Sequence, residues 1–309
     1  MGPTRTSDLA RLRGSFGPGR AGTMVSGGAR WAVRSWSGAG VGVHVTTSEE
    51  PTAHARLVDL HSHVLPGVDD GARDVDEALR MLRVAEEDGI ATIAATPHAD
   101  SVTPQQILDG VAELNRLAAD AGLRIRVVPG SEVRIAADLP ARAADGRLVT
   151  LADTPYLLLE LSLWGDWPPF LLEAIYSCQV VGLWPILAHA ERYPAVQRDP
   201  GRVLPLVERG VLVQVNADSL FGRNGRKAQW AAEELIRSRA AHLIASDAHR
   251  SDSRPPRVRA ALERAAAVAG EEYATWMAQA AVDVLRGAPV TPPQPEPPRR
   301  RRRFRWLFR

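Results

Sequence analysis

Histidine and carboxylate side chains recur in short polar motifs along the middle of the chain, each at or just after an apolar run. The candidate metal-binding residues in these motifs are His61, His63, His98, Glu132, Glu160, His189, Asp247 and His249. Imidazole and carboxylate donors together favour first-row transition metals such as Mn, Fe or Zn. A set of this size exceeds what one ion needs, so it predicts two or three ions bridged by carboxylate or hydroxide.

Each motif taken alone has an ordinary structural explanation. A lone His98 or His189 is more often a hydrogen-bonded histidine of the core, and a single Asp-x-His pair is a weak signal. Glu160 is more informative because it lies inside an apolar run, where a buried carboxylate is costly without a partner. The repetition of such motifs after successive apolar runs favours one shared site.

Apolar, β-branched runs alternate with helix-like stretches from residue 57 onwards. The runs are residues 57–60, 90–95, 124–129, 156–161, 183–188, 211–215 and 242–245, and the stretches are 74–88, 104–121, 169–181, 200–209 and 227–240. This alternation predicts parallel strands in an α/β fold. Seven units predict a (β/α) barrel, one short of the usual eight, in which the carboxyl ends of the strands meet at one face. We therefore expect the polar motifs to converge.

Several residues predict where helices begin. Asp74, with Glu77 three residues later, predicts an N-cap and a capping box. Pro104, Pro169 and Pro200 are typical of first helical turns. One further helical region is expected from residue 258 to about 286.

Composition divides the chain into three parts. Residues 1–54 hold ten glycines and little apolar periodicity, which predicts a disordered extension. Residues 55–288 form the predicted catalytic domain. Residues 289–298 hold six prolines, which predict a stiff linker before an Arg-rich tail that completes the segment 289–309.

The charge of the chain is as unevenly distributed as its composition. Residues 55–298 carry 25 basic and 33 acidic side chains, whereas the tail carries seven arginines. The sequence pI near 9.0 is therefore a property of the ends, and the fold is not expected to bind nucleic acid specifically. Cys178 is the only cysteine, so the chain forms no intramolecular disulfide and a cytoplasmic location is expected. There is neither a signal-peptide pattern nor an apolar run long enough for a transmembrane helix.

The motifs resemble those of the PHP (polymerase and histidinol phosphatase) type of bacterial protein-tyrosine phosphatase, found in capsule and exopolysaccharide operons. The matching stretches are residues 59–72, 95–98, 130–134, 188–193, 216–220 with Gly222 and Arg223, and 246–249 with 254–256. The element Leu-Pro-Gly-Val-Asp-Asp-Gly-Ala at 65–72 separates this family from other PHP proteins. The resemblance covers about residues 57–286 and implies a deformed seven-stranded barrel of the PHP superfamily.

The resemblance also implies a set of site residues. The implied ligands, usually of manganese, are His61, His63, Asp70, His98, Glu132, Glu160, His189, Asp247 and His249. From the sequence alone Asp69 and Asp70 are indistinguishable. Arg192 and Arg254 lie where the family places phosphate-binding arginines, although surface salt bridges are the alternative. His249 or a water molecule could serve as the general acid.

The expected activity is metal-dependent hydrolysis of phosphotyrosine on a membrane-associated tyrosine kinase that controls capsular or exopolysaccharide synthesis. The alternatives are a phosphoesterase of small phosphate esters such as histidinol phosphate, a nuclease, and a regulator that binds phosphotyrosine without turnover. A cysteine-based mechanism is set aside because Cys178 lacks the arginine six residues later that such phosphatases use; Trp184 is there instead.

Two aromatic segments leave alternatives open. Trp164, Trp167 and Phe170 follow the fourth apolar run and could hold the substrate ring, although ordinary loop packing explains them equally well. The Arg-rich tail also carries Phe304, Trp306, Leu307 and Phe308. This mixture predicts binding to an anionic membrane surface; polyphosphate, nucleic acid or no partner at all are the alternatives.

Overall fold

The computed structural model describes residues 57–298, so the extension predicted over 1–54 and the Arg-rich tail from 299 to 309 lie outside the described residues. The described strands are β1 (Leu57–Ser62), β2 (Ile90–Ala95), β3 (Arg126–Pro129), β4 (Glu132–Arg134), β5 (Tyr156–Glu160), β6 (Trp184–Leu187), β7 (Leu212–Asn216) and β8 (Leu243–Ala245). Every pair of neighbouring strands is parallel. The predicted α/β class with parallel strands is confirmed.

The strands form two sheets, β1-β2-β3 and β4-β5-β6-β7-β8. The third predicted run, 124–129, contains β3 alone; β4 follows after Gly130 and Ser131 and was not predicted as a strand. A Cβ atom at Gly130 would lie 2.8 Å from the Leu151 side chain and 2.9 Å from the Thr96 side chain, so a larger residue would require these side chains to shift. The two sheets are linked on both sides, through parallel bridges between His98 and Glu132 and between Ser62 and Ala248.

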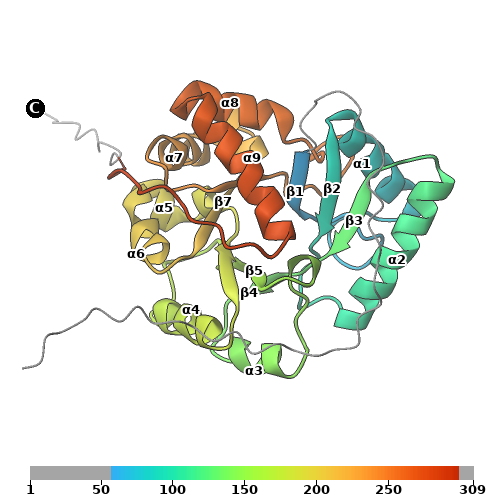
Figure 1. Ribbon diagram of the computed structural model, residues 1–309, viewed down its shortest axis with the longest axis horizontal. Helices are drawn as coiled ribbons and strands as arrows, with labels where there is room; N and C mark the ends of the chain where they lie inside the picture. Colours follow the sequence, from blue (N-terminus) through green and yellow to red (C-terminus); the bar gives the residue numbers. More distant parts are fainter. Residues whose placement is uncertain (1–56, 299–309) are drawn as a thin grey trace, which may run out of the picture. The chain divides into compact units, whose positions relative to one another are not determined.

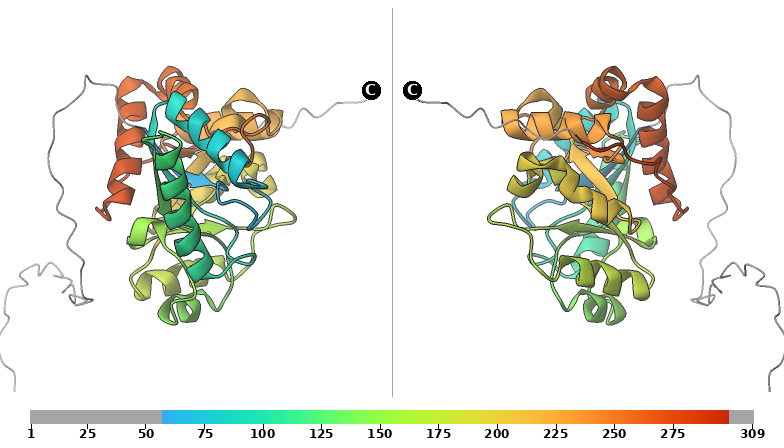
Figure 2. Two further views of the ribbon diagram at one scale, coloured as in Figure 1. Left: turned by 90° about the vertical axis from the view of Figure 1, so that its right-hand side faces the viewer. Right: turned by 90° about the vertical axis from the view of Figure 1, so that its left-hand side faces the viewer.

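Helices surround the strands (Figure 1). They are α1 (Val75–Glu87), α2 (Pro104–Asp120), α3 (Leu139–Ala144), α4 (Leu171–Val180), α5 (Pro194–Arg198), α6 (Leu204–Val207), α7 (Arg226–Arg237), α8 (Arg259–Ala269) and α9 (Glu271–Leu285), with short 3-10 turns η1 (Leu151–Asp153), η2 (Ala190–Arg192), η3 (Pro200–Val203) and η4 (Ala217–Phe221). The side views show α1 and α2 on one side of the strands and α5, α6 and α7 on the other (Figure 2). Within residues 57–298, no helix has the length and apolar character needed to cross a membrane.

The predicted capping box at Asp74 is wrong in one half. The Asp74 side chain does accept a hydrogen bond from the Glu77 amide and caps α1. The Glu77 carboxylate, however, accepts from the Ser251 amide and from Arg80 instead of returning to the cap. The longer-range contact with the Ser251 loop therefore replaces the local one.

Two other helix predictions also need correction. Pro104 and Pro200 begin α2 and η3 as expected, but Pro169 lies before α4, which begins at Leu171. The single helical region expected after residue 258 is two helices. Gly270 separates α8 from α9 with φ of 95°, a positive value that glycine adopts without steric cost and that cannot continue a right-handed helix.

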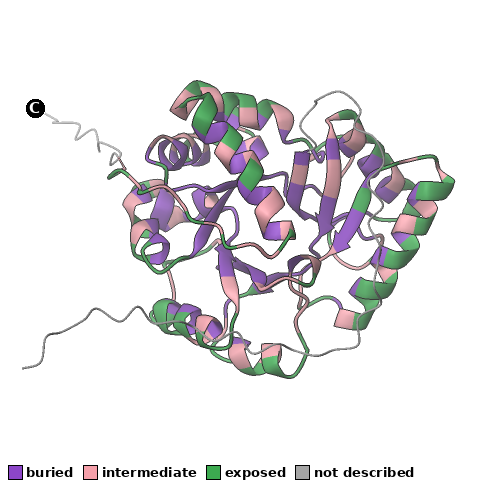
Figure 3. Ribbon diagram, viewed as in Figure 1, coloured by how far each residue is buried: buried purple, intermediate pink, exposed green. Residues whose placement is uncertain are grey.

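The core contains an inner cluster to which seven strands contribute inward-facing apolar side chains. These include Leu60, Ala94, Val128, Leu158, Ile186, Leu212 and Leu243, packed with Ala280, Ala281 and Val284 of α9. Two larger clusters fill the space between the strands and the outer helices. Figure 3 shows the same pattern, with buried residues concentrated on the strands. The inner cluster forms an apolar floor beneath the carboxyl ends of the strands.

A buried carboxylate joins the first strand to the last. Asp59 of β1 is fully buried and accepts hydrogen bonds from the backbone amide and the hydroxyl of Ser246, which follows β8. Burial raises the pKa of Asp59 to about 6, in spite of these hydrogen bonds. The contact holds in place the segment that leads into Asp247.

We expect Ser246→Ala to destabilise the metal-free protein by about 1–3 kcal/mol, because the Asp59 carboxylate would lose a buried hydrogen-bond donor. Chemical denaturation of the metal-stripped protein would measure the change. The exposed Ser101→Ala is the matched control, for which less than about 0.5 kcal/mol is expected. Equal effects of the two substitutions would contradict a clamp between β1 and β8.

Candidate metal centre

The period of the strands brings the predicted site residues to one place. Side chains two apart on a strand face the same side. The residues reached in steps of two from the inner-cluster positions Ala94, Val128, Leu158, Leu212 and Leu243 are His98, Glu132, Glu160, Asn216 and Asp247. The floor and the polar site are therefore successive layers of one inward-facing surface.

His61 and His63 reach this layer through an irregularity in β1. The pairing of β1 with β2 shifts register between Asp59 and Ser62, which changes the face that the following side chains occupy. His189 lies two residues after the end of β6 and Asp247 two residues after the end of β8. Both have positive φ angles, 32° and 53° respectively. Such left-handed conformations cost non-glycine residues roughly 1–3 kcal/mol and concentrate at functional sites.

Glu132 is the centre of the cluster. Its Oε2 lies 3.4 Å from His61 Nε2, 3.5 Å from His63 Nε2 and 3.1 Å from His98 Nδ1. Its other oxygen, Oε1, is 2.8 Å from His189 Nε2. The side chain is 1% exposed, so a single buried carboxylate contacts four imidazoles.

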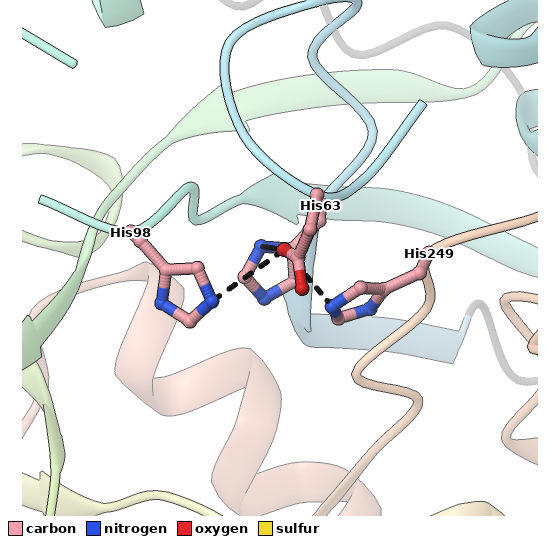
Figure 4. Close-up of side chains that lie close together, drawn as sticks. His63, His98 and His249 are labelled. Carbon is pink, nitrogen blue, oxygen red and sulfur yellow. Dashed lines mark ion pairs between the residues drawn. The ribbon is translucent and has the colours of Figure 1, made fainter. Parts of the chain in front are cut away.

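Three overlapping groups of donor atoms each lie within 4.8 Å of one another. The groups are His63, Asp70, His98 and His249; His61, His63 and Glu132; and His98, Glu132 and Glu160. Asp247 joins them, with Oδ1 3.5 Å from His61 Nε2 and 3.6 Å from His63 Nε2. In Figure 4 His63 lies between His98 and His249. Because the groups share members, they suit neighbouring ions with common ligands; ligation itself stays a prediction.

The structure separates the roles of two adjacent aspartates. Asp69 Oδ2 accepts from His63 Nδ1 at 2.7 Å and from the His98 amide, and Oδ1 accepts from the Gly71 amide. Asp70 instead faces the donor group, with Oδ1 3.4 Å from His249 Nε2 and 3.5 Å from His98 Nε2. Asp69 therefore orients His63 from behind, and Asp70 is the candidate ligand.

Gln214 orients two further histidines. Its Oε1 accepts a hydrogen bond from the His189 amide at 2.9 Å, so the same oxygen must also accept from His61 Nδ1, 3.2 Å away. The proton of His61 is thereby held on Nδ1, and the lone pair of Nε2 is left for the site. Histidines that bind metals almost always have such a partner on the other ring nitrogen.

The same network reaches Asp247. Gln214 Nε2 donates to Asn216 Oδ1 at 2.8 Å, and Asn216 Nδ2 donates to Asp247 Oδ2 at 2.6 Å. The buried Glu191 accepts hydrogen bonds from the Asn216 amide and the Ser219 hydroxyl, which fixes the start of η4. None of these orienting roles was predicted from the sequence, although Gln214 interrupts an apolar run just as Glu160 does.

Opposite charges are paired in the metal-free cluster. Hydrogen bonds to Asp70 and Glu132 raise the pKa of His98 to about 10. Burial alone would lower the pKa of His63, but contacts with Asp247 and Asp69 raise it well above its usual value. Burial likewise opposes ionisation of Glu132, yet His61 and His189 hold its pKa well below the usual range. In the absence of metal, protons on imidazoles neutralise the carboxylates.

The pKa shifts of Glu160 and His249 favour their neutral forms, in contrast to those of Glu132, His63 and His98. Burial and then the charge of Glu132 raise the pKa of Glu160. Burial, with the nearby His63 and Arg254, lowers the pKa of His249 in spite of its contact with Asp70. His249 is therefore the histidine of the His63 group that is most readily available as an unprotonated donor.

Arg192 and Arg254 lie at the edge of the cluster. Arg192 Nη1 is 3.1 Å from Asp247 Oδ2, and Arg254 Nη2 pairs with the same oxygen. Their side chains are 24% and 26% exposed, whereas Asp247 is 2% exposed. The two arginines thus converge on one buried carboxylate, and phosphate binding by them stays a prediction.

The donor set fits a transition-metal centre. Imidazole nitrogens and carboxylate oxygens alternate around one buried space, and the set contains no thiolate. His189 Nδ1 is buried and has no hydrogen-bond partner among the described residues, but His189 belongs to none of the three donor groups, so its ligation stays a prediction. The chemistry of the cluster therefore supports metal binding.

The aromatic residues after β5 lie in a different environment. Trp167 packs against the core and beneath the Arg202 guanidinium, which is 5.2 Å from its ring centroid. Trp164 is 86% exposed and Phe170 is 37% exposed. Ordinary packing explains Trp167, and contact of these residues with a substrate ring stays a prediction.

Binding of Mn²⁺ at pH 7 is expected to release protons, because His63 and His98 are protonated in the metal-free site and must become neutral to bind a metal. The apparent affinity should rise as the pH rises towards the pKa of His98, by about tenfold per pH unit for each proton released. Calorimetric titration of the metal-stripped protein in buffers of different ionisation enthalpy measures the number of protons released on metal binding. Zero proton release would show that these histidines do not bind the ion.

Gln214→Leu removes the acceptor for His61 Nδ1 and for the His189 amide. Loss of such an orienting partner lowers metal affinity by about 10- to 100-fold. Gln214→Glu retains an acceptor oxygen and is expected to lose less. The exposed Gln105→Leu on α2 serves as the control. Wild-type affinity in Gln214→Leu, measured by metal titration, would contradict the role of Gln214.

Comparison with known proteins agrees with the resemblance seen in the motifs. The tyrosine-protein phosphatase YwqE of Bacillus subtilis is 31% identical over 252 residues, which cover 80% of this chain and 99% of YwqE. The tyrosine-protein phosphatase CpsB of Streptococcus pneumoniae is 27% identical over 209 residues, 65% of this chain and 86% of CpsB.

The fold is also shared with a solved structure. A chain from the crystal structures of YwqE and CpsB, described as unique metal-dependent tyrosine phosphatases, superposes with a TM-score of 0.76 at 30% identity and covers 79% of this chain and 100% of its own. The model of the family described as capsular polysaccharide synthesis, CpsB/CapC, matches residues 57–286. The chain therefore belongs to the CpsB/CapC family of capsular polysaccharide synthesis proteins.

Proposed function

We propose that this chain is a metal-dependent protein-tyrosine phosphatase that acts on a phosphorylated tyrosine kinase controlling capsular or exopolysaccharide synthesis. The observation that carries the proposal is the junction of overlapping metal-donor groups with two arginines at Asp247. Metal ions and arginines are the two kinds of group that stabilise charge on a transferring phosphoryl group. The named activity of the related YwqE and CpsB supports the same substrate class.

The proposal includes the finer features of the family. Residues 55–288 are the catalytic domain, a deformed seven-stranded barrel of the PHP superfamily in which β3 and β4 count as one interrupted strand. Two or three divalent ions, manganese or a similar metal, are held by the nine ligand candidates. Three donor groups that share His63, His98 and Glu132 support more than one ion.

The site residues have three kinds of role in the proposed hydrolysis of a phosphomonoester: metal binding, phosphate binding and positioning of other side chains. Metal ions held by His61, His63 and Glu132 and by the overlapping donor groups would supply Lewis acidity towards phosphate oxygens and would favour ionisation of a water molecule near neutral pH. Arg192 and Arg254 bind the remaining phosphate oxygens through charge-assisted hydrogen bonds. Gln214, Asn216 and Asp69 keep the imidazoles and Asp247 in position.

The leaving group needs little help from an acid. A tyrosine side chain has a pKa near 10, well below that of an alkyl alcohol. The lowered pKa of His249 argues against this residue as the proton donor, and we assign it to metal binding. A water molecule at the exposed mouth, where Asp70 is 66% exposed, is the better candidate acid.

The alternatives are outcomes of the same experiments. A phosphoesterase of small esters would use the same donors and differ in substrate preference. A non-catalytic regulator is disfavoured because the ligand candidates form one complete cluster. The cytoplasmic location stays a prediction. Binding of the Arg-rich tail to an anionic membrane surface also stays a prediction, because the tail lies outside the described residues.

Phosphate release from a tyrosine-phosphorylated peptide should depend on Mn²⁺ and disappear in the double variant Asp247→Asn, His249→Ala. Arg254→Ala should lower kcat by about 10²- to 10³-fold, because a preorganised donor to the developing charge is lost. Arg116→Ala, which removes a surface arginine paired with Glu113 and Asp120, is the matched control. Faster turnover of histidinol phosphate than of the peptide would favour the small-ester alternative.

A further inference from the structure

Exposed apolar side chains concentrate on one segment of the described chain. Of the nine large apolar side chains that are exposed among residues 57–298, six lie between residues 164 and 181. The six, which we call the α4 patch, are Trp164, Phe170, Leu172, Tyr176, Val180 and Val181. Leu172, Tyr176 and Val180 follow one another at intervals of four and share one face of α4. Exposed apolar side chains that share one helix face, as these three do, are typical of interaction sites.

A groove adjoins the α4 patch. It has a volume of about 560 Å³ and runs between the start of α4 and the segment that forms η3 and α6. Trp167, Pro169 and Leu172 line one side, and Leu204 and Pro205 line the other. Leu172 belongs to both the patch and the groove. Since a cavity of roughly 150 Å³ holds a benzene ring, the groove has room for more than one aromatic side chain.

The chain's own C-terminal segment leads into this groove. The Tyr156 hydroxyl donates to the Ala288 carbonyl at 2.9 Å and accepts from the Val290 amide at 3.0 Å. The Glu296 amide then donates to the Ser238 carbonyl at 2.8 Å. Pro297 and Pro298, the last described residues, themselves line the groove. Residues 299–309 therefore begin at its wall.

The composition of residues 299–309 matches what the groove and the patch offer. Five arginines precede Phe304, Trp306, Leu307 and Phe308. Five extended residues span up to roughly 17 Å, so these apolar side chains can reach the groove and α4 without detaching Pro298. Arginine stems cover apolar surface while their charged ends stay in water. Residues 55–298 as a whole are net acidic, which favours contact of the seven arginines with this part of the chain, although the groove lining itself holds one acid, Asp199, and one base, Arg202.

We infer that the α4 patch and its groove are the docking surface for residues 304–308 of the same chain. The inference rests on where the chain leaves the described structure, on the apolar surface next to that point and on the net acidic charge of residues 55–298 as a whole. It is independent of the phosphatase activity. It assigns a role to the Arg-rich tail, which the proposed reaction does not use.

Disulfide trapping in the full-length protein tests the contact. Tyr176→Cys combined with Leu307→Cys should form an intramolecular disulfide under mild oxidation at least tenfold faster than Leu108→Cys combined with Leu307→Cys. Leu108 is a matched control because it is an exposed apolar residue, 45% exposed, on α2. The native Cys178 does not interfere, since it is buried and burial raises the pKa of its thiol to about 11.

Other products overturn the inference in defined ways. Disulfide-linked dimers would show that the tail docks on a second copy. Equal rates for the two pairs would show that the tail has no preferred surface. Absence of a crosslink, together with pelleting of the wild-type protein on phosphatidylglycerol vesicles, would assign the tail to a lipid surface.

Hydrogen exchange gives a second measurement that does not need engineered cysteines. In the variant with Phe304, Trp306, Leu307 and Phe308 all changed to Ala, the α4 amides should exchange at least threefold faster than in the wild type. The α2 amides of the same samples are the internal control. Unchanged exchange in α4 would refute docking, whether or not the variant retains phosphatase activity.

Discussion

The contact of one buried carboxylate with four imidazoles constrains the rest of the structure. Glu132 is almost completely buried, and an isolated carboxylate there would be strongly destabilised. It is tolerated because His61, His63, His98 and His189 surround it. These histidines come from three different strand ends, so the site exists only when β1, β2 and β6 are in register with β4.

Strand periodicity supplies that register. On or just after β2, β5, β7 and β8, each residue of the polar layer follows a residue of the apolar floor by two or four positions. The β3–β4 segment has the same spacing, with four positions between Val128 and Glu132. A one-residue slip would turn the polar layer outwards and the hydrophobic outer face inwards. Packing of the core and placement of the site are thus one constraint, and the Asp59–Ser246 contact closes it between β1 and β8.

The sequence predicted the features that depend on this simple count. Each of the seven predicted apolar runs overlaps one strand, and the motifs that follow them converge, whereas β4 was not predicted. Contacts between distant segments were not predictable from local patterns. Glu77 bonds to Ser251 instead of closing the capping box, and Asp69 differs from Asp70 only through its contact with His63. Gln214 lies two residues after Leu212 on the inward face, and its orienting role depends on contacts with His61 and His189 that the local sequence does not show.

Protons and metal ions compete for the same donors, and this competition explains how the cluster is compatible with a stable fold. Without metal, the raised pKa values of His63 and His98 place positive charge next to Glu132, Asp70 and Asp247. If metal ions bind to the proposed ligands, the ions would supply that charge and the histidines would be neutral. In both states positive charge lies next to the buried carboxylates. The free-energy cost of burying these carboxylates is therefore offset before any ion binds. The left-handed backbone conformations of His189 and Asp247 cost free energy. Hydrogen bonds from the His189 amide to Gln214 and from Asn216 to the Asp247 carboxylate offset this cost, and neither bond requires a metal ion.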